Sequence, residues 1–253
     1  MKRKIYTMLL SIFLMSMFIT TTVYASPGGI IAKEVARSPL GKLFFGIITI
    51  LLLPYLIYSA IKKRISISRS QKILYQLSRL NNNFSWSILN ERSHAIITHV
   101  YSAWKKTDIE VAKEWMTSWY WQNQKITVLE NWEEDGLQNI CKLHKIRSVK
   151  PLHIEYREKE NGDGEGSRIA LNVTVVLTDY LINKDTGKVV EGDKQKKELE
   201  NVWTIILTDG QWKLSLIEDS SEALSYAKLK SDIELANKYI GESSLNNSRS
   251  SID

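Results

Sequence analysis

A run of 19 residues without one charged side chain constrains this chain more than any other feature. Residues 43–61 read LFFGIITILLLPYLIYSAI and lie between Lys42 and the basic cluster Lys62-Lys63-Arg64. As a helix the run would be about 28 Å long at about 1.5 Å per residue, close to the hydrocarbon thickness of about 30 Å in a bilayer. We therefore interpret residues 43–61 as a transmembrane helix, the alternative being a buried core helix of a soluble protein.

The first 25 residues have the composition of a signal peptide. Lys2-Arg3-Lys4 precede the apolar residues 5–19, and Val23-Tyr24-Ala25 supplies small residues for cleavage after Ala25. An uncleaved first membrane helix is the alternative. Residues 26–42 would then form an exposed linker.

Charge is distributed unevenly around the predicted span. Residues 1–80 contain twelve of the 34 Lys and Arg but only one of the 28 acidic residues, so this part carries +11 and the remainder −5. A negative domain argues against generic binding of nucleic acid. The heavier basic flank follows residue 61, and basic flanks stay on the cytoplasmic side. We therefore expect a cytoplasmic C-terminal domain, whether the chain crosses once or as a helical hairpin.

The segment 62–83 is predicted to be a basic amphipathic linker. Ile73, Leu77 and Leu80 share one helical face, with Leu74 at its edge. Such a segment either lies on anionic lipid or forms a solvated linker helix. Its candidate membrane-surface residues are Lys62, Lys63, Arg64, Arg69, Lys72 and Arg79.

Residues 84–228 begin with a helical pattern. A long helix is expected over 84–104, and Thr107 with Glu110 three residues later has the pattern of a capping box for a second helix. A third helix would run from Trp119 to Trp132. After the charged break at 133–136, the spacing of Leu137 and Leu143 predicts one more short helical turn.

Alternation of apolar and polar residues then predicts strands over 144–158, 168–183, 199–207 and 212–216. Residues 183–197 are expected to form a charged connection with a short strand at Val189-Val190, and Asp209-Gly210 a two-residue hairpin turn. Asp219 or Ser220 would start a last helix that extends to Leu235, and residues 229–253 its end and a disordered tail. The expected fold is α+β: N-terminal helices packed on a curved antiparallel sheet of about four strands.

The sequence contains no strong catalytic signature. The glycines of residues 161–166, NGDGEG, lie between two strands and not between a strand and a helix, so a phosphate site is not expected. The four histidines form no zinc or metalloprotease pattern. The single cysteine, Cys141, excludes an internal disulfide and is interpreted as a small buried residue. We expect no catalytic residues, no cofactor and no metal.

The tryptophans are the remaining signal. The chain has eight, and Trp115, Trp119 and Trp121 lie close together in the sequence. Core packing explains them, and an aromatic-lined pocket or peptide groove is the alternative. These three are the candidate partner or pocket aromatics.

Two stretches resemble Tim-forty-four-like domains. HAIITHVYSAWKKTDIEVAKEWMTSWYW (residues 94–121) is similar to the helical opening of that family, and VWTIILTDGQWKLSLIEDS (residues 202–220) to its closing hairpin. The resemblance covers roughly residues 84–228. It implies the cone-shaped fold of the nuclear-transport-factor-two-like superfamily. Eukaryotic relatives include a peripheral inner-membrane subunit of the mitochondrial import machinery and a mitochondrial ribosomal protein, and bacterial relatives often carry a signal or span before the domain.

The resemblance implies a bacterial inner or plasma membrane protein that acts as a non-enzymatic scaffold. It would bind a protein partner or lipid at the cytoplasmic face, in protein transport or membrane-complex assembly. The chain lacks the long chaperone-recruiting N-terminal region of the mitochondrial subunit, which argues against a role as an import motor. The family has no shared catalytic residues. The alternative is an enzyme or small-ligand binder that uses the hollow of the cone.

Overall fold

The computed structural model describes residues 38–157 and 164–230. The predicted signal peptide, most of the exposed linker and the expected tail lie outside these residues, as does Leu235. The chain divides into two compact units between Ile61 and Lys62. The division falls where the apolar run gives way to the basic cluster.

Helix α3 (Pro39–Leu77) contains the whole apolar run, including Pro54. In the described part of the chain it is the one helix long and apolar enough to cross a membrane, and only 6% of its most apolar window is buried. A core helix would be covered by other side chains, so this exposure is compatible with a membrane anchor.

The part of α3 that follows Lys62 belongs to the folded domain. Ile73, Leu74 and Leu77 are between 0 and 2% exposed and lie in the main hydrophobic core, with Leu80 packed against it. The predicted apolar stripe is present, and the core of the domain covers it. The helix after residue 62 is therefore not a free linker, and contact of its basic side chains with lipid stays a prediction. The folded domain therefore begins before Phe84, the boundary predicted from the sequence.

A helical layer follows: η1 (Asn82–Phe84), α4 (Trp86–Lys106), the 3-10 helix η2 (Ile109–Trp115), α5 (Ser118–Gln124), the π-helix η3 (Lys125–Leu129) and α6 (Glu130–Glu134). The capping box expected at Thr107 is wrong by one residue. Thr107 ends α4 in the left-handed conformation, with φ 54°, and Asp108 caps η2 by accepting a hydrogen bond from the Glu110 N–H.

The sheet is a meander of four antiparallel strands in the order β1-β2-β3-β4. They are β1 (Leu137–Glu155), β2 (Arg168–Asn183), β3 (Val189–Thr208) and β4 (Gln211–Asp219). The bounds of β2 are those predicted. Two predictions were wrong: residues 137–143 start β1 and form no helical turn, and most of the charged connection 183–197 belongs to β3. Pairing with β2 overrides the weak local signal of these charged residues.

Register shifts bend β1 where it pairs with β2, at residues 143–145, 146–148 and 151–153. Such bulges curve a strand and change which face its side chains occupy. Leu152 was expected on the same face as Ile146 and Ile154. The third bulge instead turns Leu152 to the opposite face, where it is fully buried in a second, smaller core.

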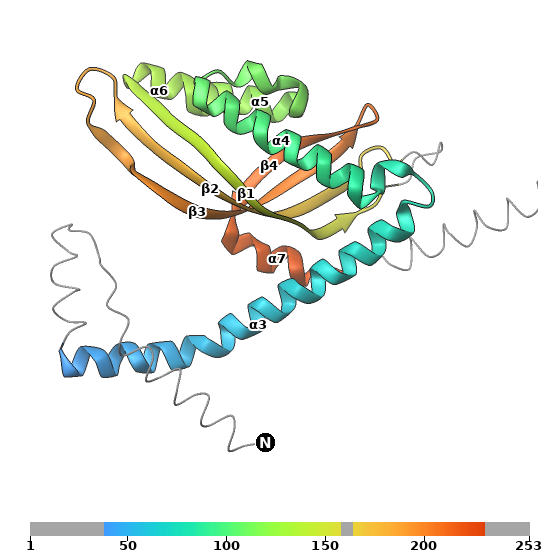
Figure 1. The fold of residues 1–253 in the computed structure, drawn as a ribbon, viewed down its shortest axis with the longest axis horizontal. Coiled ribbons are helices and arrows are strands. Elements are labelled where there is room, and N and C mark those ends of the chain that lie inside the picture. Colours follow the sequence, from blue (N-terminus) through green and yellow to red (C-terminus); the bar gives the residue numbers. More distant parts are fainter. Residues whose placement is uncertain (1–37, 158–163, 231–253) are drawn as a thin grey trace, which may run out of the picture. The chain divides into compact units, whose positions relative to one another are not determined.

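The two faces of the sheet have different covers (Figure 1). The inner face packs on the α4 layer through the main core, to which β2 contributes Ile169, Leu171, Val173, Val175 and Leu177. The outer face carries the second core, where Ala223 and Ala227 of α7 (Ala223–Lys228) meet Leu152, Ala170 and Val202. The short 3-10 helix η4 (Ser220–Glu222) leads into α7. Its N-cap is Asp219, one of the two residues predicted to start the last helix.

The predicted hairpin turn between β3 and β4 is confirmed. Asp209 and Gly210 both have positive φ, 53° and 69°, as a two-residue turn of this type requires. The turn places Trp212 back on the inner face. There the indole N–H donates to the Asn83 carbonyl oxygen at 2.9 Å, and the ring meets Phe84 edge-on with centroids 5.5 Å apart.

Replacing either Trp203 or Trp212 with Ala should destabilise the domain by about 3–5 kcal/mol, because both side chains are only 2% exposed. That is a large part of the roughly 5–15 kcal/mol of a typical domain. Urea unfolding of the detergent-solubilised protein measures the loss. Trp119→Ala is the matched control, since its side chain is 65% exposed, and should leave the midpoint unchanged. An unchanged midpoint for Trp203→Ala would contradict the core assignment.

Candidate functional site

The inner face of the sheet is where a cone-shaped domain would hold a small ligand. In the described residues this face is filled by the main core, with Trp203, Leu171 and Ile205 each at most 2% exposed. Tyr101 of α4 lies over Trp203, with ring centroids 5.8 Å apart. These side chains pack against one another and fill this part of the inner face.

The three candidate tryptophans have different environments. Trp121 packs against the main core, Trp115 is half-buried, and Trp119 projects from α5 with 65% of its surface exposed. A single pocket lined by all three is therefore not what the burial pattern indicates. Trp119 is the one whose side chain is available to a partner, and a large exposed aromatic group is typical of interfaces.

Trp115 is held by two residues of α4. Its indole stacks on the exposed His99 ring with centroids 4.1 Å apart and an angle of 9°, and the Arg92 guanidinium lies 4.0 Å from the ring centroid. Partial burial lowers the Arg92 pKa from its ordinary value, but a guanidinium remains charged at neutral pH. The cation–π contact and the ring stacking hold the Trp115 side chain in place in the helical layer.

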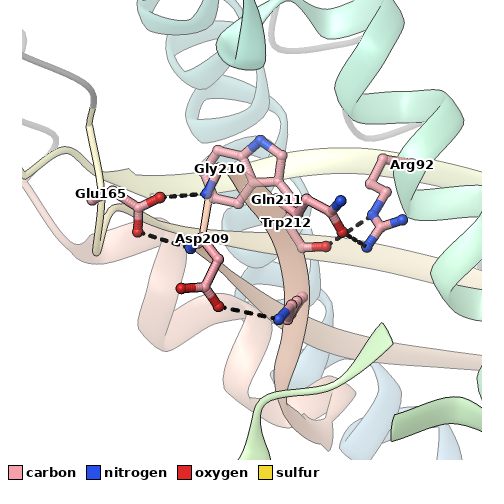
Figure 2. Close-up of polar contacts among 7 residues, drawn as sticks. Arg92, Glu165, Asp209, Gly210, Gln211 and Trp212 are labelled. Atoms are coloured by element: carbon pink, nitrogen blue, oxygen red, sulfur yellow. Dashed lines mark hydrogen bonds and ion pairs between the residues drawn. The ribbon is translucent and has the colours of Figure 1, made fainter. Parts of the chain in front are cut away.

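Arg92 also ties α4 to the β3–β4 hairpin (Figure 2). It donates to the Trp212 carbonyl oxygen at 3.0 Å and to the Gln211 side chain at 3.2 Å. On the other side of the turn, the Glu165 carboxylate accepts hydrogen bonds from the N–H groups of Asp209 and Gly210, at 3.2 and 2.6 Å. The hairpin tip is therefore fixed from two directions.

The glycine-rich loop thus has a structural role in the part that the structure describes. Glu165 caps the hairpin, and a Cβ on Gly164 would lie 2.7 Å from the Phe84 ring, so only glycine fits there. The first part of the loop, residues 161–163, is outside the described residues.

Five of the six predicted membrane-surface residues lie on α3, and Arg79 lies in the turn directly after it. Lys63 forms an ion pair with Glu200 at 2.9 Å, and Arg79 lies over the exposed Tyr75 ring. A shallow depression of about 490 Å³ runs along the helix, and its described lining residues are Ser68, Gln71, Lys72, Tyr75, Gln76 and Arg79. Its lining is polar and basic, which suits an anionic group better than an apolar ligand. A smaller one, of about 170 Å³, lies between Thr107 and Glu133 in the helical layer.

Cys141 is buried, as predicted, in a polar corner of the inner face. Its side chain is 4% exposed and hydrogen bonds to Asp179, the residue opposite it on β2. Burial first, and the Asp179 carboxylate second, raise the pKa of the thiol from 9.0 to about 12. Burial likewise raises the pKa of Tyr101 and of Tyr120. These groups stay protonated at neutral pH and offer no nucleophile.

Histidines and acidic residues do not assemble a metal site in the described residues. His144 donates to or accepts from the Thr178 hydroxyl at 3.0 Å, and desolvation followed by the charges of Lys196 and Lys142 lowers its pKa. His153 lies beside Tyr226 on the outer face, and burial lowers its pKa. Both are therefore neutral imidazoles at neutral pH.

A family model described as the Tim44-like domain matches residues 70–219. The chain belongs to this family. The match begins at Ser70, inside α3, which agrees with the burial of Ile73, Leu74 and Leu77 in the core. The resemblance drawn from residues 94–121 and 202–220 is confirmed. Membership in the Tim44-like family supports a membrane-associated role related to protein transport, at the level of the family.

Three solved structures that match this chain are distant from it in sequence. The intermembrane space region of the chloroplast protein ARC6 is 12% identical, with a TM-score of 0.36 over 51% of this chain and 95% of that chain. A candidate polyketide cyclase from Xanthomonas campestris pv. campestris is 12% identical, with a TM-score of 0.26 over 55% and 98%. AclR, a candidate hydroxylase from Streptomyces galilaeus, is 16% identical, with a TM-score of 0.25 over 59% and 98%. A comparison with curated protein sequences gives no match.

The environment of Cys141 predicts a thiol that reacts only when the domain opens. At mildly alkaline pH, iodoacetamide should modify the native protein far more slowly than the urea-unfolded protein, because burial blocks access and disfavours the thiolate. The raised pKa also stabilises the fold below pH 9.0, and this contribution is lost as the pH rises towards about 12. Equal alkylation rates in the folded and unfolded protein would contradict the assignment.

Proposed function

We propose that this protein is a membrane-anchored, non-enzymatic scaffold. Residues 43–61 cross the membrane, and the Tim44-like domain is held at its cytoplasmic face, where it binds a protein partner or lipid. The process served is protein transport or the assembly of a membrane complex, and the membrane is the bacterial inner or plasma membrane.

The observation that carries the proposal is the continuity of α3. One helix contains the exposed apolar run and, without a loop after it, the buried residues Ile73, Leu74 and Leu77. A chain that only needed attachment would work with a flexible linker at this point. Building the same helix into the domain core supports a scaffold whose domain is held close to the membrane.

Two surfaces supply the binding chemistry in this proposal. Lys72 of α3 and Arg79 of the following turn are exposed and suit anionic lipid headgroups, at about 1 kcal/mol for each side chain near the surface. The exposed Trp119 suits an apolar or aromatic anchor of a protein partner. The filled inner face supports binding at these surfaces.

Anchoring by residues 43–61 predicts that alkaline carbonate leaves the protein in the membrane pellet. The long exposed apolar surface would otherwise have to enter water, at a cost of roughly 25 cal/mol per Å². A variant with charged residues at Leu51, Leu52 and Ile57 should fail to insert and serves as the control. Release of the unchanged protein into the supernatant would overturn the anchor.

A cytoplasmic domain predicts that an impermeant thiol reagent labels Glu114→Cys only after cells are opened. Glu114 is exposed on η2, whereas Cys141 is buried and therefore unsuited to this measurement. The unsubstituted protein is the control and should remain unlabelled under both conditions. Labelling of Glu114→Cys in intact cells would place the domain on the outer side.

Partner binding through Trp119 predicts that Trp119→Ala weakens capture without weakening the fold. Photo-crosslinking from a neighbouring exposed position, Gln122, in intact membranes should give a defined adduct that Trp119→Ala abolishes. Val111→Ala, an exposed apolar residue of η2, is the control. An adduct that persists unchanged in Trp119→Ala would remove this surface from the proposal.

A further inference from the structure

Exposed basic side chains gather on one part of the outer sheet face. Lys142, Lys145 and Lys150 of β1 lie opposite Thr178, Val176 and Asn172 of β2. These β2 residues alternate with the buried series from Leu171 to Leu177, so they and their partners face away from α4. Further basic residues reach the same part from β1 and β3. Together the basic sheet face consists of Lys142, Lys145, Arg147, Lys150, Lys194 and Lys196.

Two acidic residues in these rows form ion pairs, and Glu218, in the row of Lys150, accepts a hydrogen bond from the Tyr226 hydroxyl at 2.7 Å. Glu198 forms an ion pair with Arg147 at 3.0 Å, and Glu200 forms one with Lys63 of α3 at 2.9 Å. Between the lysines lie the hydroxyls of Ser148 and Thr174, 3.2 Å apart, which can donate to phosphate oxygens. After residue 80 the acidic residues outnumber the basic ones. The gathering of lysines on one face therefore means that positive charge is concentrated there in a domain that is negative as a whole.

Two contacts of α3 fix the direction in which this face extends. The Ser66 hydroxyl donates to the Leu152 carbonyl oxygen at 2.6 Å, next to the row of Ala170. Three residues closer to the apolar run, Lys63 meets Glu200, in the row of Thr174. Moving along α3 from Ser66 to Lys63 therefore moves along the outer face from the row of Ala170 to the row of Thr174, next to the row of Lys145.

The turn beyond these rows has the composition of a membrane-interface segment. Val189 and Val190 are 40% and 58% exposed, and they directly follow the Lys184–Lys188 turn. Exposed apolar side chains beside lysines can enter the headgroup layer while the ammonium groups stay with phosphates.

We propose that the basic sheet face and the β2–β3 turn contact the anionic surface of the same bilayer that holds residues 43–61. This inference rests on the proposed membrane anchor and goes beyond it. It makes the outer face of the sheet, and not α3 alone, the surface turned to the lipid. Trp119, which belongs to the helical layer on the inner face, stays free for a protein partner.

The test uses the full-length protein reconstituted into vesicles. Val190→Cys carries an environment-sensitive fluorophore, and the vesicles contain spin-labelled lipid as a quencher. Cys141 is buried, and labelling of the unsubstituted chain checks that it stays silent. Fluorescence should be quenched in vesicles that contain phosphatidylglycerol and not in vesicles of phosphatidylcholine alone. Added salt should reduce the quenching, since it screens the lysines.

Charge reversal isolates the sheet face. Lys142→Glu, Lys145→Glu and Lys150→Glu together should reduce quenching to the level of phosphatidylcholine. The matched control, Lys105→Glu, Lys106→Glu and Lys113→Glu, makes the same change of net charge at exposed positions of α4 and η2 and should leave quenching intact. If the first triple variant does not fold, the salt dependence of the Val190→Cys protein decides alone.

Three outcomes overturn the inference: no quenching in either lipid, equal quenching in both, or equal loss in the two triple variants. Carbonate extraction of the same vesicles separates this failure from that of the proposed function. A protein that remains in the pellet with an unquenched label refutes only the sheet-face contact, as when the lysines serve an acidic protein partner. A protein that is released refutes the anchor itself.

Discussion

The burial of Ile73, Leu74 and Leu77 is the contact on which the rest of the structure depends. It makes the last turns of the long helix α3 part of the domain core, where these side chains pack with Phe84, Leu89 and other core residues. Each such side chain contributes about 1.5–3 kcal/mol when fully buried. The domain therefore cannot be cut from α3 at residue 84 without exposing part of its own core.

Much of the architecture could be predicted from local patterns. The strand at 168–183, the Asp209-Gly210 turn and the long helix near 84–104 each carry a strong signal of their own, and each is present within two residues of its expected bounds. The failures share one cause. Residues 189–197 and 137–143 become strand because β2 pairs with them, and the stripe at Ile73 and Leu77 is buried because the domain lies against it. Periodicity reveals an apolar face but not the surface that will cover it.

The candidate surfaces were predictable only in part. Sequence proximity put Trp115, Trp119 and Trp121 together, but the break between η2 and α5 gives them separate environments. The basic residues of α3 were apparent because they are contiguous in sequence. Those of the sheet face were not, because β1 and β3 bring them together across β2. The four basic residues within residues 142–150 were a signal in the sequence, but their uneven spacing hides the common face that the bulges of β1 give them.

The meander order of the sheet has a consequence for synthesis. Each strand pairs with the one made just before it, so pairing needs few distant contacts and favours rapid folding. The core does not follow this order. Phe84 and Asn83, near the start of the domain, are completed by Trp212 of the last strand, and Thr117 donates its N–H to the Leu214 carbonyl oxygen. During synthesis on a ribosome, the helical layer therefore cannot complete its core contacts until β4 has been made. Until then, part of the apolar surface of the helices stays exposed.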